Sequence, residues 1–166
     1  MILDFSGWQT CQVLALVRLR LYAEAQRRID GLGDLDSTEY SYEAHGETYP
    51  GESGSMVPFT LRLLWAELPV LVATDSTGDK ETMSRLHQLH TMTKRMLDSR
   101  SLPDSAEEDR YSCMSTLDAV SRIEDTTEAW ADRRIRTVLA LVGRYSAKQN
   151  FTAAVQLLQK VPSWTV

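Results

Sequence analysis

Two stretches of this chain repeat one spacing of aromatic, small and aliphatic residues, and this spacing restricts the folds open to the chain. The stretches are Tyr145-x5-Phe151-x2-Ala154-x3-Leu158-x2-Val161 and, more weakly, Tyr22-x2-Ala25-x3-Ile29-x2-Leu32. In a repeated pair of antiparallel helices, a small residue stands where the helices cross, and larger residues lock the pair on either side. Ala154 and Ala25 are those small residues, 129 positions apart. The repeated spacing therefore predicts helical hairpins of the tetratricopeptide type.

The first and last hairpins can be delimited from the period of their apolar residues. Residues 5–17 and 21–32 are expected to form the first hairpin, which is closed by Gly33. Asp125-x-x-Glu128 is a helix-cap signal that opens the last hairpin, whose second helix starts at Asn150. This hairpin ends at Val161, because Pro162 cannot continue the backbone hydrogen bonds of a helix.

A middle hairpin is predicted between them. Its first helix starts at Pro58, and Pro69 should kink it or end its first part, with the chain resuming at Leu71 and stopping near Gly78. A helix from Asp79 to Leu97 follows. Because no segment alternates apolar and polar residues for long, we predict an all-α fold, a tetratricopeptide-like α-solenoid of about three helical hairpins.

The remaining segments are polar. Residues 33–57 are expected to be a long acidic connector, and residues 98–109 a polar loop or a partly disordered segment. Ser105-x-x-Glu108 has capping-box spacing, so a further helix through Ile123 is an open alternative. Solenoid repeats contact only their neighbours, so we expect residues 1–166 to form a single repeat domain.

Charge is distributed unevenly along the chain. The formal net charge of -5 argues against a general binder of nucleic acids or anionic membranes, which normally has a basic excess. The last 34 residues, however, carry a charge of +6 and no acidic residue, whereas residues 34–55 contain six acidic residues and no Lys or Arg. These runs are either solvated surfaces or opposite fields that orient the chain against neighbouring subunits.

Cysteine usage and hydropathy favour a cytosolic protein. Cys11 and Cys113 lie far apart, in no pattern typical of a disulfide framework or a zinc site. No apolar run approaches the length of a membrane span, and the N-terminus lacks the basic residues of a signal peptide. We therefore expect no direct insertion into a membrane.

The sequence contains none of the common catalytic or metal-binding motifs. Phosphate-binding loops, dinucleotide-binding glycine motifs and zinc-protease helices are absent from it. His87 and His90 are three residues apart on an expected helix, but a third ligand near them is lacking, so we interpret them as surface or half-buried histidines. We expect no catalytic residue, cofactor or metal, and we predict that the protein is not an enzyme.

The segment after the acidic connector resembles a known family. Residues 49–59 read Tyr-Pro-Gly-Glu-Ser-Gly-Ser-Met-Val-Pro-Phe and are followed by Leu61-Arg62-Leu64 and Ala66-Glu67-Leu68-Pro69. Upstream lies Leu19-Arg20-Leu21-Tyr22-Ala23-Glu24-Ala25-Gln26. Both segments are similar to the family of the twelfth subunit of the TRAPP vesicle-tethering complex, which has tetratricopeptide repeats. The chain is shorter than that family, and residues 98–124 differ from its pattern.

The resemblance implies a structural function. Such subunits join TRAPP assemblies that promote nucleotide exchange on Rab GTPases in traffic between the endoplasmic reticulum and the Golgi. It implies a non-catalytic scaffold or adaptor that binds other TRAPP subunits, is linked only indirectly to Rab GTPases, and lies in the cytoplasm at the periphery of ER-Golgi membranes. The alternative from another class is a co-chaperone-like module that clamps acidic peptide tails.

Candidate partner-binding residues follow from the expected concave face of the solenoid and from the residues 49–59 segment. If the last repeat is in register, Arg136, Leu139, Gly143, Ser146 and Ala147 face the groove, and Arg62 and Ala66 face it in the middle hairpin. Arginines there could fork onto carboxylates of a partner. The candidates are Tyr49, Met56, Phe59, Arg62, Arg133, Arg136, Leu139, Arg144 and Ser146. Alternatively, the segment of residues 49–59 could pack against the helices and have a purely structural role.

Overall fold

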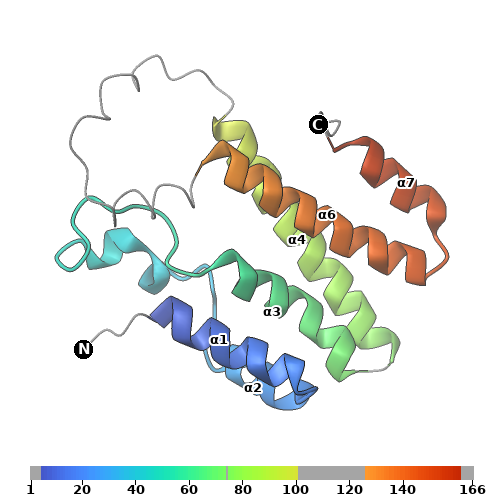
Figure 1. Ribbon diagram of the computed structural model, residues 1–166, viewed down its shortest axis with the longest axis horizontal. Helices are drawn as coiled ribbons and strands as arrows, with labels where there is room; N and C mark the ends of the chain where they lie inside the picture. Colours follow the sequence, from blue (N-terminus) through green and yellow to red (C-terminus); the bar gives the residue numbers. More distant parts are fainter. Residues whose placement is uncertain (1–4, 74, 101–125, 162–166) are drawn as a thin grey trace. The chain divides into compact units, whose positions relative to one another are not determined.

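The chain is a set of helical hairpins, as Figure 1 shows. The computed structural model describes residues 5–73, 75–100 and 126–161. In these ranges the α-helices are α1 (Phe5–Arg18), α2 (Tyr22–Asp30), α3 (Phe59–Val72), α4 (Ser76–Arg100), α6 (Thr127–Ala147) and α7 (Phe151–Gln159), with short 3-10 helices η1 (Thr38–Tyr40) and η2 (Tyr42–His45). The all-α prediction is confirmed. The helix considered for residues 105–123 lies outside the described residues. The chain divides into two compact units, Met1–Leu86 and His87–Val166.

The first unit is built around α2, which packs against both α1 and α3. Ala25 is fully buried, as expected for the small residue at a helix crossing. Ile29 is 1% exposed and belongs to one apolar cluster with Val13 of α1 and with Leu61 and Leu68 of α3. Of the predicted spacing, Ala25 and Ile29 therefore lie in the core, and Tyr22 and Leu32 pack against it half-buried.

Pro69 does not end α3, which continues to Val72. A proline has no N–H, so the carbonyl of Trp65, four residues earlier, loses its helical donor. The Arg85 Nη1 of α4 donates to this carbonyl at 2.9 Å, and the N–H of Val70 donates to the Thr82 hydroxyl of α4 at 3.0 Å. Helix α4 thus satisfies the backbone groups around the proline, which sequence periodicity could not reveal.

The boundary between α3 and α4 also differs from the prediction. The helix expected to stop near Gly78 ends at Val72, and α4 begins at Ser76 instead of Asp79. The Asp75 carboxylate accepts hydrogen bonds from the backbone N–H groups of Thr77 and Gly78 at 3.1 and 3.2 Å. The bond from Gly78 is the main cause that lowers the pKa of Asp75. Gly78 is therefore part of a capped first turn and not a helix stop.

The second unit contains the C-terminal part of α4 and the hairpin of α6 and α7. Helix α6 starts where the Thr126 hydroxyl accepts a hydrogen bond from the N–H of Ala129 at 3.1 Å. Thr126 is thus the cap. The predicted cap residue Asp125 lies outside the described residues. Leu141 is fully buried and Ala154 is 5% exposed, so the α6 and α7 helices meet at the predicted small residue.

The hairpins α1–α2 and α6–α7 turn in the same way. Arg20 and Gln149 both adopt left-handed backbone, with φ of 60° and 57°. The next residue donates its N–H five positions back, from Leu21 to Leu16 and from Asn150 to Tyr145, at 2.9 Å in each case. This is the Schellman motif, which usually has glycine at the left-handed position. The repeat predicted from side-chain spacing is therefore also a repeat of backbone conformation.

Candidate partner-binding surfaces

One face of α6 carries several of the predicted partner-binding residues. Arg136, Leu139, Gly143 and Ala147 follow one another at steps of three or four residues, and all four are exposed. Residues with this spacing share one side of a helix. Leu139 is 51% exposed, which is high for a large apolar side chain. Ser146, predicted for the same face, is half-buried. The α6 face is thus an exposed strip of one cation, one leucine and two small residues.

The arginines of α6 have different surroundings. The Arg136 guanidinium pairs with Asp132 one turn earlier at 2.8 Å, and both side chains are more than half exposed. The Arg133 guanidinium lies over the ring of Trp130, 4.6 Å from its centroid, and the indole itself is 8% exposed. Arg144 is half-buried. Arg136 is therefore the arginine most open to a partner's carboxylate among these three.

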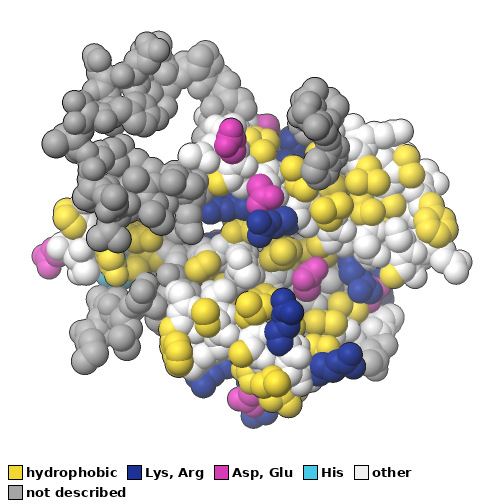
Figure 2. All heavy atoms as spheres, in the orientation of Figure 1, with side chains coloured by type: hydrophobic (Ala, Val, Ile, Leu, Met, Phe, Trp, Pro, Cys, Tyr) yellow, Lys and Arg dark blue, Asp and Glu magenta, His cyan; other side chains and the backbone are white. Residues whose placement is uncertain are grey.

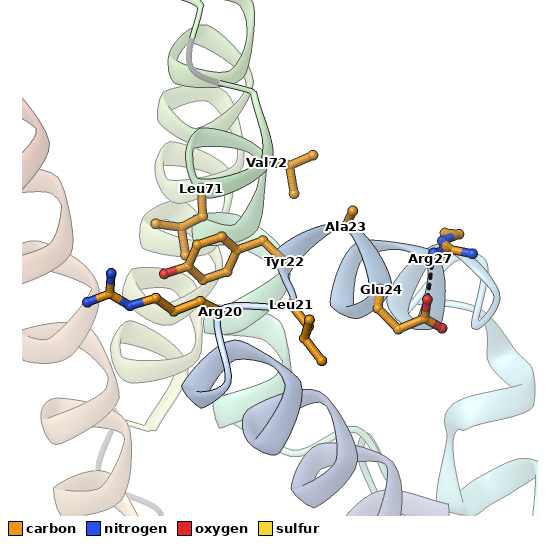
Figure 3. Close-up of a pocket in the computed structure, with 8 residues that line it drawn as sticks. All are labelled: Arg20, Leu21, Tyr22, Ala23, Glu24, Arg27, Leu71 and Val72. Atoms are coloured by element: carbon orange, nitrogen blue, oxygen red, sulfur yellow. Dashed lines mark ion pairs between the residues drawn. The ribbon is translucent and has the colours of Figure 1, made fainter.

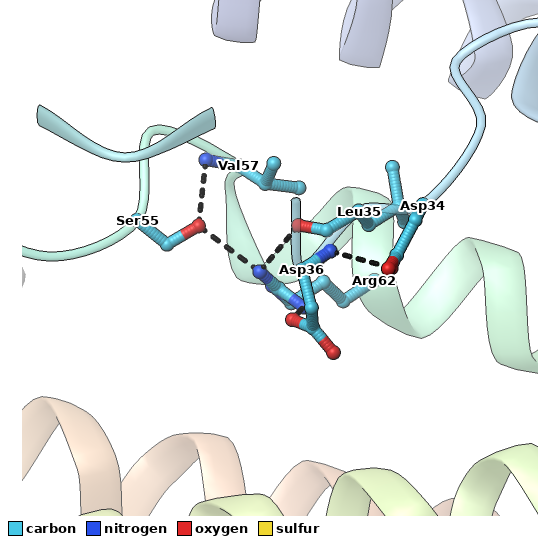
Figure 4. A network of polar contacts seen from close by, with 6 residues as sticks. All are labelled: Asp34, Leu35, Asp36, Ser55, Val57 and Arg62. Atoms are coloured by element: carbon cyan, nitrogen blue, oxygen red, sulfur yellow. Dashed lines mark hydrogen bonds and ion pairs between the residues drawn. The ribbon is translucent and has the colours of Figure 1, made fainter. Parts of the chain in front are cut away.

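Arg62 is placed differently from its prediction. Its side chain is 10% exposed, so it does not face an open groove, and the neighbouring Ala66 is fully buried. Figure 4 shows its guanidinium donating to the Asp36 carboxylate, to the Leu35 carbonyl at 2.9 Å and to the Ser55 hydroxyl at 3.0 Å. These acceptors lie near the two ends of the 33–57 connector. Arg62 is therefore a residue that ties both ends of the connector to α3.

The 33–57 connector is folded by further contacts. The Tyr40 hydroxyl donates to the Leu32 carbonyl at 2.7 Å, and the N–H of Met56 donates to the Tyr40 carbonyl at 2.8 Å. The Glu43 carboxylate accepts from the N–H of Gly54 at 2.8 Å, and this bond is the main cause that lowers the pKa of Glu43. The acidic residue Glu43 thus helps to hold its own loop together.

The other predicted partner-binding residues of the first unit also pack within this loop. The ring of Tyr49 meets that of Tyr42 edge to face, with centroids 5.5 Å apart. Met56 is half-buried, and Phe59, at the start of α3, is 9% exposed. These positions support the architectural interpretation of the residues 49–59 segment, which the sequence had left open.

A shallow hollow of about 470 Å³ lies where the turn between α1 and α2 meets the C-terminal end of α3 (Figure 3). Leu21, Leu71 and Val72 give it an apolar floor and are between 40 and 51% exposed. At its rim the Arg27 guanidinium pairs with the Glu24 carboxylate at 2.6 Å. The hollow is too open and too weakly polar to indicate a particular small molecule.

The two histidines of α4 have separate environments. The Nε2 of His87 lies 2.9 Å from the Tyr145 hydroxyl. Burial, and then the charges of Arg134, His87, Lys94 and Lys160, lower the pKa of His90. In the part of the chain that the structure describes, no group of three or more potential ligands could hold a metal ion.

The outer face of α7 is an exposed apolar surface that the residue spacing did not predict. Phe151 and Leu158 belong to the spacing that was predicted to lock the helix pair, but they are 61 and 44% exposed. Val155, on the same side of α7, is 50% exposed. Figure 2 shows hydrophobic side chains gathered over α7. A single partner helix covers only one side of a helix, and in the hairpin α6 takes the side of Ala154. The exposed Phe151, Val155 and Leu158 form the α7 stripe.

Known proteins resemble this chain over most of its length. The chain is similar to trafficking protein particle complex subunit 12. It is 29% identical to the Homo sapiens protein over 146 residues, which are 88% of this chain and 19% of that protein. It is also 29% identical to the subunit 12 of Mus musculus over 140 residues, which are 84% of this chain and 16% of that protein. The chain therefore spans less than a fifth of the length of the subunit 12 proteins it matches.

No protein-family model matches the sequence, and no solved structure matches it. Across the described ranges, no helix combines the length and the apolar character that a membrane crossing requires.

Proposed function

We propose that this chain is a non-catalytic adaptor in a vesicle-tethering complex of the TRAPP type and works by binding other subunits. The observation that carries the proposal is the similarity to trafficking protein particle complex subunit 12, which extends over 88% of the chain. The match covers 146 residues and is thus not confined to one short motif. We further propose that the chain acts in ER-Golgi transport, at the cytoplasmic periphery of these membranes, with only an indirect link to Rab GTPases.

The α6 face is the proposed contact with another subunit. It combines Leu139, which is 51% exposed, with the exposed cation Arg136. Interfaces are commonly built from an apolar anchor surrounded by polar groups, and arginine is enriched in them. Arg133 and Arg144 extend the positive charge along the same helix, and half-buried Ser146 lies near its C-terminal end. A partner surface with carboxylates around an apolar pocket would fit this strip.

The test is a pull-down of the tagged chain from cytosol, followed by mass spectrometry of the retained proteins. The wild-type chain should retain a set of TRAPP subunits, and the double variant Arg136→Glu/Leu139→Asp should lose them. The matched control is Arg28→Glu/Leu19→Asp, because Arg28 and Leu19 are also exposed but lie in the first unit. This control should retain the subunits.

Each result separates the parts of the proposal. A wild-type chain that retains no TRAPP subunit contradicts the adaptor function. Retention of chaperones in their place would favour the clamp for acidic peptide tails. If the α6 variant retains the same subunits as the wild-type chain, the adaptor function stands and the α6 face is not the contact.

A further inference from the structure

The α7 stripe corresponds in register to a surface that the first unit covers with a helix. The shared Schellman turn aligns α2 with α7, so that Ala25 matches Ala154 and Ile29 matches Leu158. Both alanines are buried, but Ile29 is 1% exposed and Leu158 is 44% exposed. The difference has a simple cause: α2 packs against α3 as well as α1, and Ile29 shares an apolar cluster with residues of α3. The matching face of α7 therefore has the geometry of a surface that receives a helix.

The residues of the α7 stripe are also more apolar than their counterparts. Phe151 takes the place of Tyr22, and Val155 takes the place of the half-buried Gln26. Phe151, Val155 and Leu158 stand at steps of four and three residues, so their side chains lie in one row along α7. A partner helix with large apolar residues at the same steps would interlock with this row.

The charges around α7 indicate which charge a partner helix should have. From residue 133 to residue 161 the chain has six Lys or Arg residues and no Asp or Glu. Lys148 precedes α7 and Lys160 follows it, and the Arg134 guanidinium donates to the Lys160 carbonyl at 3.1 Å. Positive charge thus stands at both ends of the α7 stripe. Complementary charge on a partner orients docking and excludes wrong partners.

We infer that the α7 stripe is a docking site for an acidic amphipathic helix of a partner protein. The inference deepens the proposed adaptor function and rests on it, because it names the kind of partner segment that a second surface of the same unit receives. A helix is favoured over an anionic membrane because the flanking polar residues Thr152, Gln156 and Gln159 are uncharged. A helix that binds to a membrane surface normally has Lys and Arg along its polar face.

The inference can be tested with the full chain and a synthetic peptide as the probe. The peptide has about 20 residues, with leucines at positions i, i+3, i+4 and i+7 and glutamates on the flanks. A matched peptide has lysines in place of the glutamates. Fluorescence anisotropy of the labelled acidic peptide should give a micromolar Kd, and the lysine peptide should bind at least about tenfold more weakly.

Two variants show whether the α7 stripe is the binding site. Phe151→Ser/Leu158→Ser should weaken the acidic peptide at least tenfold, about 1.4 kcal/mol. Leu19→Ser, which changes a side chain that is 68% exposed in the first unit, should leave the Kd unchanged. Lys160→Glu should weaken the acidic peptide and strengthen the lysine peptide. This exchange of preference is a gain of binding that a misfolded protein could not produce.

Several results would overturn the inference. Equal binding of the two peptides would show mere hydrophobic attraction, and an unchanged Kd in the serine variant would place the site elsewhere. Sedimentation with phosphatidylserine vesicles, abolished by the serine variant, would make the α7 stripe a membrane contact. Light scattering that shows a dimer dissociated by the serine variant would make it a contact with a second copy. Because the titration uses no cytosol, its failure leaves the pull-down and the adaptor function untouched.

Discussion

Replacing Arg62 should loosen the 33–57 connector and destabilise the first unit. The guanidinium has three acceptors: the Asp36 carboxylate, the Leu35 carbonyl and the Ser55 hydroxyl. The carboxylate is 71% exposed and can return to water when the arginine is removed. The Leu35 carbonyl cannot be hydrated in the same way, because its hydrogen bond to Arg62 is buried. The cost should therefore arise mainly at Leu35 and only slightly at Asp36.

The size of the effect follows from these surroundings. An ion pair with an exposed partner contributes about 0–1 kcal/mol, and a buried carbonyl left without a donor costs about 1–3 kcal/mol. Arg62→Ala also leaves an unfilled space, so we expect a loss of about 3 kcal/mol in the free energy of unfolding. Arg62→Met keeps most of the volume and relieves the burial of a charge, so the loss should fall to about 1–2 kcal/mol. Asp36→Asn should cost less than about 1 kcal/mol.

Hydrogen exchange measured by mass spectrometry, together with urea unfolding, would test this order. Peptides from residues 33–57 should exchange faster in Arg62→Ala and Arg62→Met than in the wild-type chain, whereas Asp36→Asn should change them little. Arg28→Ala, at an exposed position of α2, serves as the control. If Arg62→Met exchanges and unfolds like the wild-type chain, the bonds of the guanidinium only offset its burial, and the reasoning given for Arg62 is wrong.

Three further predictions concern single positions. A Cβ at Gly78 would lie 2.5 Å from the Pro69 carbonyl oxygen, so Gly78→Ala should lower the free energy of unfolding by about 2 kcal/mol or more. Gly143, inside α6 with nothing within 4 Å of its added Cβ, is the matched control, and Gly143→Ala should raise it by about 0.5–1 kcal/mol in urea unfolding. Arg20 and Gln149 have left-handed backbone at φ 60° and 57°, which glycine adopts more easily. Arg20→Gly and Gln149→Gly should therefore each raise the free energy of unfolding by about 0.5–1 kcal/mol, seen as a higher melting temperature. The pKa of His90 in the folded state is lowered from its ordinary value of 6.5. As pH falls below 6.5, the folded state therefore binds fewer protons than the unfolded state. The contribution of His90 to stability should be complete above pH 6.5 and be lost as pH falls toward the folded pKa, and His90→Gln should flatten this part of the curve of melting temperature against pH.

The helices could be predicted where the periodic spacing of apolar residues within a single segment is enough to define them. Both hairpin copies and their alanines were found from spacing alone, because a close helix crossing admits only a small residue. The end of α3 was not predictable, because Pro69 is compensated by Arg85 and Thr82 of another helix. The sequence pattern of a segment reflects interactions within that segment, and it does not show a hydrogen-bond donor or acceptor from a distant helix.

The candidate surfaces show the same limit. The exposed row of Arg136 and Leu139 on α6 follows from helical spacing and agrees with the structure. The sequence does not distinguish Arg62 from Arg136, since both are arginines on an expected helix face. Arg62 is buried because Leu35, Asp36 and Ser55, which are distant in the sequence, accept its hydrogen bonds. The outward position of Leu158 was missed for a related reason: an apolar stripe indicates that a helix face is to be covered, and it does not say whether the same chain covers it.

The closed base of the 33–57 connector suggests a place to modify this protein. Because Arg62 joins the two ends of the loop, the helices on either side do not depend on how many residues lie at its tip. Lengthening a loop whose ends are already held together adds only a slowly growing entropic cost, about 0.6 kcal/mol for each doubling of its length. The exposed residues Gly46, Glu47 and Thr48 are therefore a natural position for an inserted epitope or fluorescent label, far along the chain from the surfaces of α6 and α7.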